Sequence, residues 1–171
     1  MPRYFSFISH DEADERDFHY TNVQLPSKNL SIGWGKINPI NKSKEEIKHL
    51  IETFYPDFRG TVNPDNGAKS LTMFTSLNIG DIVFVRGKAI ILDTVIVTGN
   101  AFFKTDPDDG YFLKIPIEPV FENIRMDINT VNIPEEIYNE IIFDGGRTLV
   151  MRGIRESSAN KLLFNILKLK N

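Results

Sequence analysis

An apolar run that turns sharply and returns constrains the fold of this chain more than any other stretch. Residues 82–85 read Ile-Val-Phe-Val, and residues 89–98 return as a longer run rich in β-branched side chains, with Arg86-Gly87-Lys88 between them. Unbroken apolar runs are typical of strands with two buried faces, and the short connection containing glycine predicts a hairpin. We therefore expect this hairpin at the centre of a sheet.

Four more segments have the apolar pattern and the bounding turn residues of strands, namely residues 4–8, 30–37, 111–121 and 147–154. Pro116 and Pro119 lie within the third of these segments. Proline cannot donate a hydrogen bond to a neighbouring strand. We therefore expect that strand to lie at an edge of the sheet or to be bulged.

The clearest helix start is at Ser43, which is followed three residues later by Glu46, as in a capping box. The apolar side chains that follow repeat at the spacing of one buried helical stripe: Ile47, Leu50, Ile51 and Phe54. Pro56 ends this helix. The pattern predicts a helix that packs against the sheet.

Further helices are expected over residues 68–77 and 134–142, with a loop at 61–67. At the end of the chain, Ser157 or Ser158 is expected to cap a C-terminal helix.

Length and composition bound the class of protein. A chain of 171 residues with 41% hydrophobic content is the size of one domain with a proper core. The absence of cysteine excludes disulfides and thiol chemistry. No apolar run reaches the roughly 18 residues that span a bilayer, and the start lacks a signal-peptide pattern, so we expect a cytoplasmic protein. The net charge of −3 argues against indiscriminate coating of nucleic acid.

The motifs of common enzyme classes are missing from the sequence. His10, His19 and His49 are too scattered to predict a pair of metal ligands. No phosphate-binding loop and no nucleophile elbow is present, and the single acid-x-Lys match of a restriction-type nuclease, at 46–48, precedes every Pro-Asp pair. We therefore expect a binding protein without a metal or cofactor rather than an enzyme.

Trp34 is the only tryptophan, and it stands between Gly33 and Gly35 just ahead of the first predicted long helix. Glycines beside a large aromatic ring leave the backbone free to approach a flat ligand that lies on the ring. The alternative is a core tryptophan whose glycines relieve crowding, because buried aromatic rings usually pack.

Residues suited to holding a nucleobase follow other strands. Ser9 and His10 come directly after the first strand, although capping of a short helix or turn is an alternative role for them. Phe102 and Phe103 follow the break at Gly99. Rings that stack on an everted base, together with polar groups that read its edge, form such a site.

Five motifs follow one another along the chain: Ile32-Gly33-Trp34-Gly35, the helix that starts at Ser43, Phe74 ahead of Ile79-Gly80-Asp81-Ile82-Val83, Lys88-Ala89-Ile90-Ile91, and Val97-Thr98-Gly99. Their order and spacing resemble the EVE-like members of the PUA-like superfamily and, more distantly, the YTH readers of methylated adenine. The resemblance covers residues 3–121. It implies an α+β fold, a PUA-like small mixed β-barrel of about five to six strands with flanking helices. One domain is then expected over 1–171, with a C-terminal strand and helix at 147–169 packed on its core.

The resemblance also implies a base-binding pocket, formed by Trp34, Gly35, Ser9, His10, Phe102 and Phe103. In it, Trp34 matches the first aromatic residue of the base cage, and Gly35 matches the neighbour whose backbone contacts the base. Phe102 or Phe103 lies near the second wall of the cage. The expected phosphate contacts are Lys36, Lys42, Arg86 and Lys88.

Domains of this kind form the N-terminal recognition module of McrB-like, modification-dependent restriction endonucleases. The implied function is a DNA-binding reader of a modified, methylated base, with DNA favoured over RNA and no membrane partner. A nuclease or NTPase is then expected on another domain or partner. Two alternatives remain open: a small ASCH-like hydrolase or ribonuclease that uses Lys36 and Asp81, and an RNA-binding PUA-like module.

Overall fold

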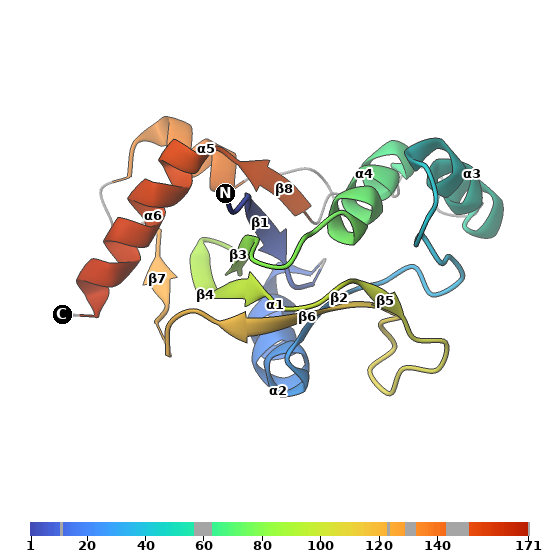
Figure 1. Ribbon diagram of the computed structural model, residues 1–171, viewed down its shortest axis with the longest axis horizontal. Helices are drawn as coiled ribbons and strands as arrows, with labels where there is room; N and C mark the ends of the chain where they lie inside the picture. The colour runs from blue at the N-terminus through green and yellow to red at the C-terminus, as the bar shows by residue number, and fades with distance from the viewer. Residues whose placement is uncertain (11, 57–62, 123, 129–132, 143–150, 171) are drawn as a thin grey trace.

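The described strands form one open, curled sheet with helices around it (Figure 1). The computed structural model describes residues 1–171 apart from 11, 57–62, 123, 129–132, 143–150 and 171. The strand order is β2-β6-β4-β3-β1-β8, with β5 paired to β6 and β7 paired to β4. The strands are β1 (Tyr4–Ile8), β2 (Asn29–Ile32), β3 (Ile82–Arg86), β4 (Ile90–Val97), β5 (Phe102–Phe103), β6 (Leu113–Pro119), β7 (Met126–Asp127) and β8 (Met151–Ile154). The expected α+β class is confirmed, with more strands than the five to six expected.

The predicted hairpin is confirmed at the centre of the sheet. β3 and β4 pair antiparallel, and β1 runs parallel to β3 on its other side. Successive side chains of a strand point to opposite faces. Accordingly, Val83 and Val85 join one hydrophobic cluster, whereas Phe84 joins another. The central strands are therefore buried on both faces, which explains their unbroken apolar sequence.

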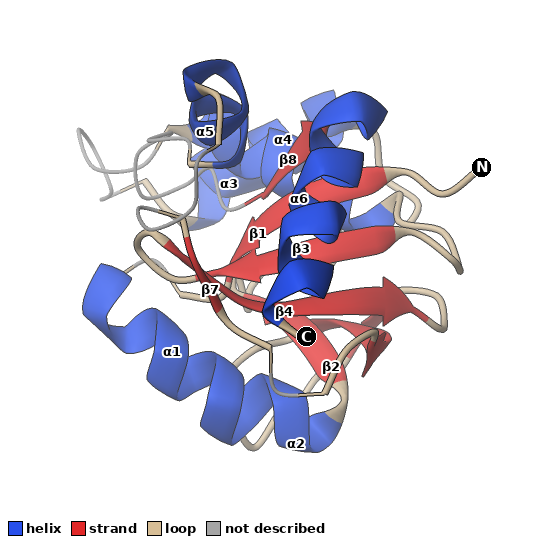
Figure 2. Ribbon diagram, turned by 90° about the vertical axis from the view of Figure 1, so that its left-hand side faces the viewer, coloured by secondary structure: helices blue, strands red, loops and turns tan. Residues whose placement is uncertain are grey.

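Helices cover both faces of the sheet. The second cluster, around Phe84, is closed by α5 (Glu135–Ile141) and α6 (Glu156–Leu169), and Figure 2 shows α6 lying across the strands. The first and larger cluster is closed by α3 (Lys44–Phe54) and α4 (Pro64–Thr75). Within the described residues, none of the helices is long and apolar enough to cross a membrane.

The proline-containing strand was expected at an edge of the sheet or bulged, and the first of these alternatives is wrong. β6 lies between β2 and β4, and it changes partner along its length. Its residues 113–116 pair with β2, and its residues 117–119 pair with β4. The carbonyl of Pro116 accepts a hydrogen bond from the Thr98 amide at 2.9 Å. Proline is tolerated inside this sheet because each half of β6 has its own partner, so Pro116 and Pro119 stand near the ends of the two ladders.

A helical segment after β1 is the largest departure from expectation, because the sequence there predicts only a short helix or turn. It consists of a 3₁₀ turn η1 (Ala13–Glu15), α1 (Arg16–His19), a π-helical turn η2 (Tyr20–Gln24) and α2 (Leu25–Ser27). Its buried side chains are His19, Tyr20 and Gln24. Two of these are polar, so the segment shows no apolar helical period for a sequence pattern to detect.

The start of α3 is confirmed as a capping box. The Ser43 hydroxyl accepts from the Glu46 amide at 3.2 Å, and the Glu46 carboxylate accepts from the Ser43 amide at 2.6 Å. α4 begins at Pro64, inside the stretch expected to be a loop, because the Asn63 side chain caps it by accepting from the Asp65 amide at 3.0 Å.

The N-terminus of α6 is capped by a residue of another helix. Neither Ser157 nor Ser158 stands at the cap, because α6 begins at Glu156 and its N-cap residue is Arg155. The Glu140 carboxylate of α5 accepts from the Arg155 amide, and it accepts from the Ser158 hydroxyl at 2.6 Å. The Arg155 guanidinium adds an ion pair to Glu140 at 3.0 Å. The carboxylate of Glu140, on a different helix, therefore takes the place of the expected serine cap.

Glu140→Gln is expected to lower the free energy of unfolding by about 1–2 kcal/mol, because it removes the charge from a helix N-terminus. Burial acts to raise the pKa of Glu140, but hydrogen bonds from Arg155 and Ser158 outweigh it and hold the pKa below its ordinary value. With the folded pKa below the unfolded one, the stabilisation is present above the unfolded pKa and is lost as the pH falls through the folded pKa. The difference between the two proteins should therefore shrink in acid.

Urea unfolding at neutral and acidic pH measures this difference. Glu136→Gln is the matched control, since Glu136 is an exposed glutamate on the same helix and its loss should change the unfolding free energy by less than about 0.5 kcal/mol. Equal losses for both variants, or a difference independent of pH, would contradict the assignment of the cap.

Candidate functional site

The turn that follows β2 holds Trp34 in a left-handed backbone conformation. β2 ends at Ile32, earlier than expected, and Trp34 has φ of 72°, whereas neither flanking glycine has a positive φ. The Trp34 carbonyl accepts from the Ile37 amide at 2.9 Å, which closes the turn. A left-handed conformation costs a residue with a side chain about 1–2 kcal/mol, and such strain is concentrated at functional sites. Either flanking glycine could adopt that conformation at little cost, but the strained position is occupied by Trp34. The turn therefore fixes the position of the tryptophan ring.

The Trp34 ring is half-buried at the margin of the larger hydrophobic cluster. It meets the Tyr55 ring edge-on, with centroids 5.1 Å apart and planes at 89°. The Trp34 ring also packs closely against Gly67, since a Cβ at that position would stand 3.1 Å from the ring atom Cζ2. The Lys36 amide donates to the Tyr55 hydroxyl at 3.2 Å, and the Lys36 ammonium lies 5.6 Å from the Tyr55 ring centroid. Trp34 is thus held by its neighbours without being fully enclosed.

Gly35 approaches a second aromatic group. A Cβ at Gly35 would fall 2.2 Å from the Phe112 ring atom Cε2, so only glycine fits there with the ring in place. Phe112 stacks on Phe103, with centroids 5.8 Å apart and planes at 28°. Phe102 is 39% exposed and points to the opposite face of β5. Trp34, Tyr55, Phe103 and Phe112 are called the aromatic cluster below.

Ser9 and His10, expected to read a base or to cap a short helix or turn, both bond backbone groups at the start of the helical segment, although the Ser9 hydroxyl donates to a carbonyl and caps no amide. The Ser9 hydroxyl donates to the Arg16 carbonyl at 2.6 Å, and His10 Nδ1 accepts from the Glu12 amide at 3.1 Å. These atoms hold the start of the helical segment. The Ser9 carbonyl in turn accepts from the Gln24 amide group at 3.3 Å.

His19 and Gln24 carry the buried polar atoms that sequence reasoning missed. The His19 ring lies 5.5 Å from the His10 ring and 4.4 Å from the Tyr111 ring. His19 is 7% exposed, and neither of its ring nitrogens has a hydrogen-bond partner within the described residues. Burial, followed by the nearby His10, lowers the pKa of His19, although Asp109 and a weak hydrogen bond to the Ser9 backbone act in the opposite direction. The ring is therefore neutral at neutral pH, with one donor and one acceptor.

The orientation of the Gln24 amide is decided by its partners. Nε2 donates to the carbonyl of Ser9 at 3.3 Å, to the carbonyl of Ser31 at 3.2 Å and to the Ser31 hydroxyl at 3.3 Å. A carbonyl accepts only, so the amide cannot be flipped. Oε1 is then an acceptor on a fully buried side chain, and it has no donor within the described residues. Ser9, His10, His19, Gln24, Ser31 and Tyr111 are called the polar cluster below.

The two clusters meet at consecutive residues. Tyr111 contacts His19 in the polar cluster, and Phe112 contacts Gly35 and stacks on Phe103 in the aromatic cluster. The structure therefore connects five of the six predicted pocket residues through Tyr111 and Phe112, and it leaves out Phe102. The aromatic pair at the start of the segment 111–121 was the sequence signal for this connection.

Residues 8–143, which include both clusters, match a protein family described as a domain of unknown function, DUF8426. The chain belongs to this family. The DUF8426 match contains every residue of both clusters, and it ends before β8 and α6.

The fold of this DUF8426 chain is also found in a solved structure. A hypothetical protein from Leishmania major has a TM-score of 0.51 to it at 12% sequence identity, over 100% of this chain and 98% of the other. At that identity the likeness shows the fold alone. No curated protein matches the DUF8426 chain.

The predicted phosphate contacts differ in their exposure. Lys36, Lys42 and Lys88 are exposed. Arg86 is only 2% exposed, and its guanidinium donates to the carbonyls of Gly87 at 3.2 Å and Lys88 at 3.3 Å. Arg86 therefore holds the β3–β4 turn rather than a phosphate, because β3 carries its side chain inward.

The residue pair expected for the hydrolase alternative is not formed in this DUF8426 chain. Asp81 is 3% exposed, and its carboxylate accepts from the Arg3 guanidinium at 2.6 Å and from the Asn78 amide at 2.8 Å. Lys36 lies instead beside Tyr55. Among the described residues, no group of three or more metal-ligating side chains comes together.

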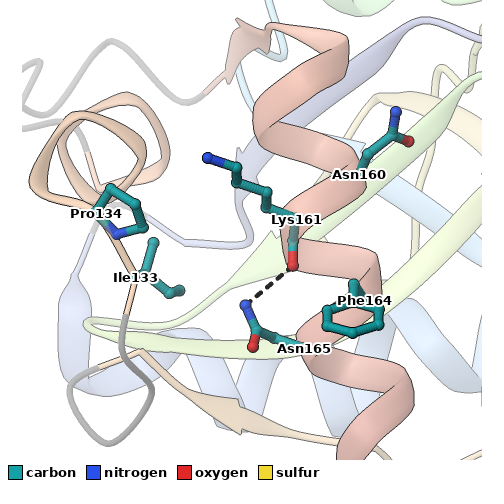
Figure 3. Close-up of a pocket in the computed structure, with 6 residues that line it drawn as sticks. All are labelled: Ile133, Pro134, Asn160, Lys161, Phe164 and Asn165. Atoms are coloured by element: carbon teal, nitrogen blue, oxygen red, sulfur yellow. Dashed lines mark hydrogen bonds between the residues drawn. The ribbon is translucent and has the colours of Figure 1, made fainter.

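A separate hollow of about 370 Å³ lies between the start of α5 and α6 (Figure 3). Ile133 and Pro134 stand on one side of it, and Phe164 stands on the other. The Asn165 side chain donates to the Lys161 carbonyl at 3.0 Å, which ties it to its own helix. None of the predicted site residues lines this hollow, so it is distinct from the two clusters.

Gly35→Ala is expected to lower the free energy of unfolding by about 1–2 kcal/mol, because the new Cβ displaces Phe112 from its stack on Phe103. Gly33→Ala is the matched control: a Cβ at Gly33 meets nothing within 4 Å, so the change should stay within about 0.5 kcal/mol. Chemical denaturation of the three proteins checks this. Equal stability of the two variants would contradict the close approach at Gly35.

Proposed function

We propose that this DUF8426 chain is a nucleic-acid reader that holds an everted, modified base between the aromatic and polar clusters. Its fold is then of the PUA-like kind, and the ligand is DNA in preference to RNA. The base is methylated, and the chain acts as the targeting domain of a modification-dependent restriction system. Cleavage or nucleotide hydrolysis belongs to another domain or partner in this proposal.

One observation carries the proposal: the buried polar atoms of His19 and Gln24 that lack hydrogen-bond partners within the described residues lie close to a group of aromatic rings. Orphaned buried polar atoms are costly, typically about 1–3 kcal/mol each, and few are kept without a reason. Gln24 Oε1 requires a hydrogen donor, and the neutral His19 ring offers one donor and one acceptor. A flat heteroaromatic ring that bears an amino group supplies both needs, as adenine and cytosine do.

The aromatic cluster supplies the apolar half of such a site. Trp34 is held edge-on by Tyr55 and at Gly67, so little conformational entropy is lost when a base stacks on it. A methyl group on the base adds apolar area to the same contact. The strained backbone at Trp34 supports a role for the ring in binding, in addition to its packing.

The charge distribution supports contact with few phosphates. The net charge is −3, and acidic side chains gather between residues 12 and 17. Lys36 and Lys42 are exposed and follow Trp34 closely in the chain. Because the logarithm of affinity falls by about 0.9 per phosphate contact for each decade of salt, we expect a shallow salt dependence for duplex DNA.

A binding panel tests the proposal. The probes are duplex and single-stranded DNA and RNA oligonucleotides of one sequence, carrying N6-methyladenine, 5-methylcytosine, 5-hydroxymethylcytosine or no modification. We expect tighter binding to one modified duplex than to its unmodified counterpart, with a similar salt slope for both. Equal binding to all probes with a steep salt slope indicates phosphate contact alone and contradicts the proposal. Preference for the RNA probes would support the RNA-binding alternative instead.

A further inference from the structure

A groove of about 570 Å³ lies where α4 meets strands β1 and β8, and it takes no part in the aromatic or polar cluster. Its floor is apolar and is formed by Phe5, Met73 and Met151. Phe5 and Met151 are buried, whereas Met73 is half-buried. Methionine adapts its shape to an incoming side chain, so this floor suits the insertion of one apolar group. This feature is called the basic groove below, because of its rim.

The rim of the basic groove carries an excess of positive charge. Lys44 and Lys69 share a single carboxylate, since their ammonium groups lie 2.9 Å and 3.2 Å from the two oxygens of Asp65. One carboxylate neutralises one of the two ammonium groups and leaves a net positive charge. Arg3 and Arg152 also line the groove, although the Arg3 guanidinium is already paired with the Asp81 carboxylate at 2.6 Å. An acidic group placed at this rim is therefore favoured.

The occupant of the basic groove should combine an apolar side chain with negative charge, because the floor of the groove is apolar and its rim is positive.

The chain carries a segment with that chemistry on the helical turns after β1. Phe18 is 64% exposed, which is unusual for so large an apolar ring. Asp14 and Glu15 precede it by four and three positions, so all three side chains share one helical face, and both acids are exposed. Glu12 is exposed as well. This segment is called the acidic segment below.

We propose that the acidic segment of one copy of the chain docks in the basic groove of a second copy. Phe18 then covers the methionine floor, and Asp14 and Glu15 meet the shared charge of Lys44 and Lys69. A phosphodiester strand matches the rim but leaves the apolar floor exposed, so a protein segment fits the groove better than nucleic acid does. The contact joins two different surfaces, so it is head-to-tail and extends from dimers to longer assemblies. It is independent of base reading.

Sedimentation velocity of the intact chain, over a range of protein and salt concentrations, tests this association. We expect assembly that grows with protein concentration and weakens with salt. Lys69→Glu and Glu15→Lys should each weaken it by about tenfold or more, because each places like charges together. Phe18→Ser should weaken it by removing the inserted ring. Lys170→Glu, at an exposed position near the end of α6, is the control and should leave it unchanged.

Mixing the two charge variants gives the sharpest test. Lys69→Glu retains an intact acidic segment, and Glu15→Lys retains an intact basic groove, so an equimolar mixture should regain the association that neither variant shows alone. Far-ultraviolet circular dichroism confirms that each variant is folded. A wild-type chain that stays monomeric at all concentrations, single variants that assemble like the wild type, or a mixture that stays monomeric would each overturn the proposal.

Discussion

Trp34→Ala is expected to weaken binding of the preferred modified oligonucleotide by about 5- to 150-fold, which is the loss of one base-stacking contact of about 1–3 kcal/mol. Binding of the unmodified duplex should change much less, because phosphate contacts remain. The physical reason is the geometry of the turn, which holds the ring half-exposed at a strained backbone position. Fluorescence anisotropy with matched modified and unmodified duplexes measures both affinities.

Two control variants separate stacking from folding in this experiment. Phe102→Ala removes an exposed ring of β5 that lies outside the aromatic cluster, and it should leave the preference intact. Trp34→Phe keeps an aromatic face and should retain part of the preference. Thermal unfolding shows whether Trp34→Ala is still folded. An unchanged preference in folded Trp34→Ala would return this residue to a packing role alone.

Tyr20→Phe is expected to lower the free energy of unfolding at neutral pH by about 1.5–3 kcal/mol, the usual contribution of a hydrogen bond to a charged group. Tyr20 is 1% exposed, and its hydroxyl donates to the Asp93 carboxylate at 2.6 Å. This bond joins the helical segment to the middle of β4. Without it, the buried Asp93 carboxylate keeps, among the described residues, only the hydrogen bond from the Thr94 amide at 2.8 Å. Burial, and then the bond to Asp93, raises the pKa of the Tyr20 hydroxyl, so it stays protonated.

The pH dependence of that loss has a defined sign. Burial raises the pKa of Asp93 above its ordinary value, and the hydrogen bonds from Tyr20 and Thr94 offset only part of this effect. With the folded pKa above the unfolded one, the contribution of Asp93 to stability is full below the unfolded pKa and is lost as the pH rises through the folded pKa. Removing the Tyr20 donor raises the folded pKa further. The loss in Tyr20→Phe should therefore be larger at neutral pH than in acid.

Urea unfolding at both pH values measures the loss. Tyr138→Phe serves as the control, because Tyr138 is a half-buried tyrosine of α5 that packs on the other hydrophobic cluster. Tyr138→Phe should lose less unfolding free energy than Tyr20→Phe, and its loss should not depend on whether Asp93 is protonated. Similar losses in the two variants, or a larger loss for Tyr20→Phe in acid, would contradict the role given to this hydrogen bond.

Much of the candidate site could be named from the sequence, but the partners of its residues could not. Trp34 and Gly35 stood out because a lone tryptophan between glycines is a local signal. His19 and Gln24 gave no such signal, since their importance comes from lacking partners after burial. The choice of Phe103 over Phe102 depended on which face of β5 meets Phe112. Likewise, Arg86 resembled a surface cation until the inward register of β3 was known.

The sequence by itself determined the features that depend on neighbours in the chain. The central hairpin and the capping box at Ser43 follow from residue periodicity and from short-range hydrogen bonds, which act within a few positions. Only the tertiary structure decided the interior place of β6, the capping of α6 by Glu140 and the meeting of the two clusters at Tyr111 and Phe112. Each of these rests on contacts between segments far apart in sequence. Such contacts are selected by the packing and hydrogen bonding of the whole fold, and a local pattern carries no record of them.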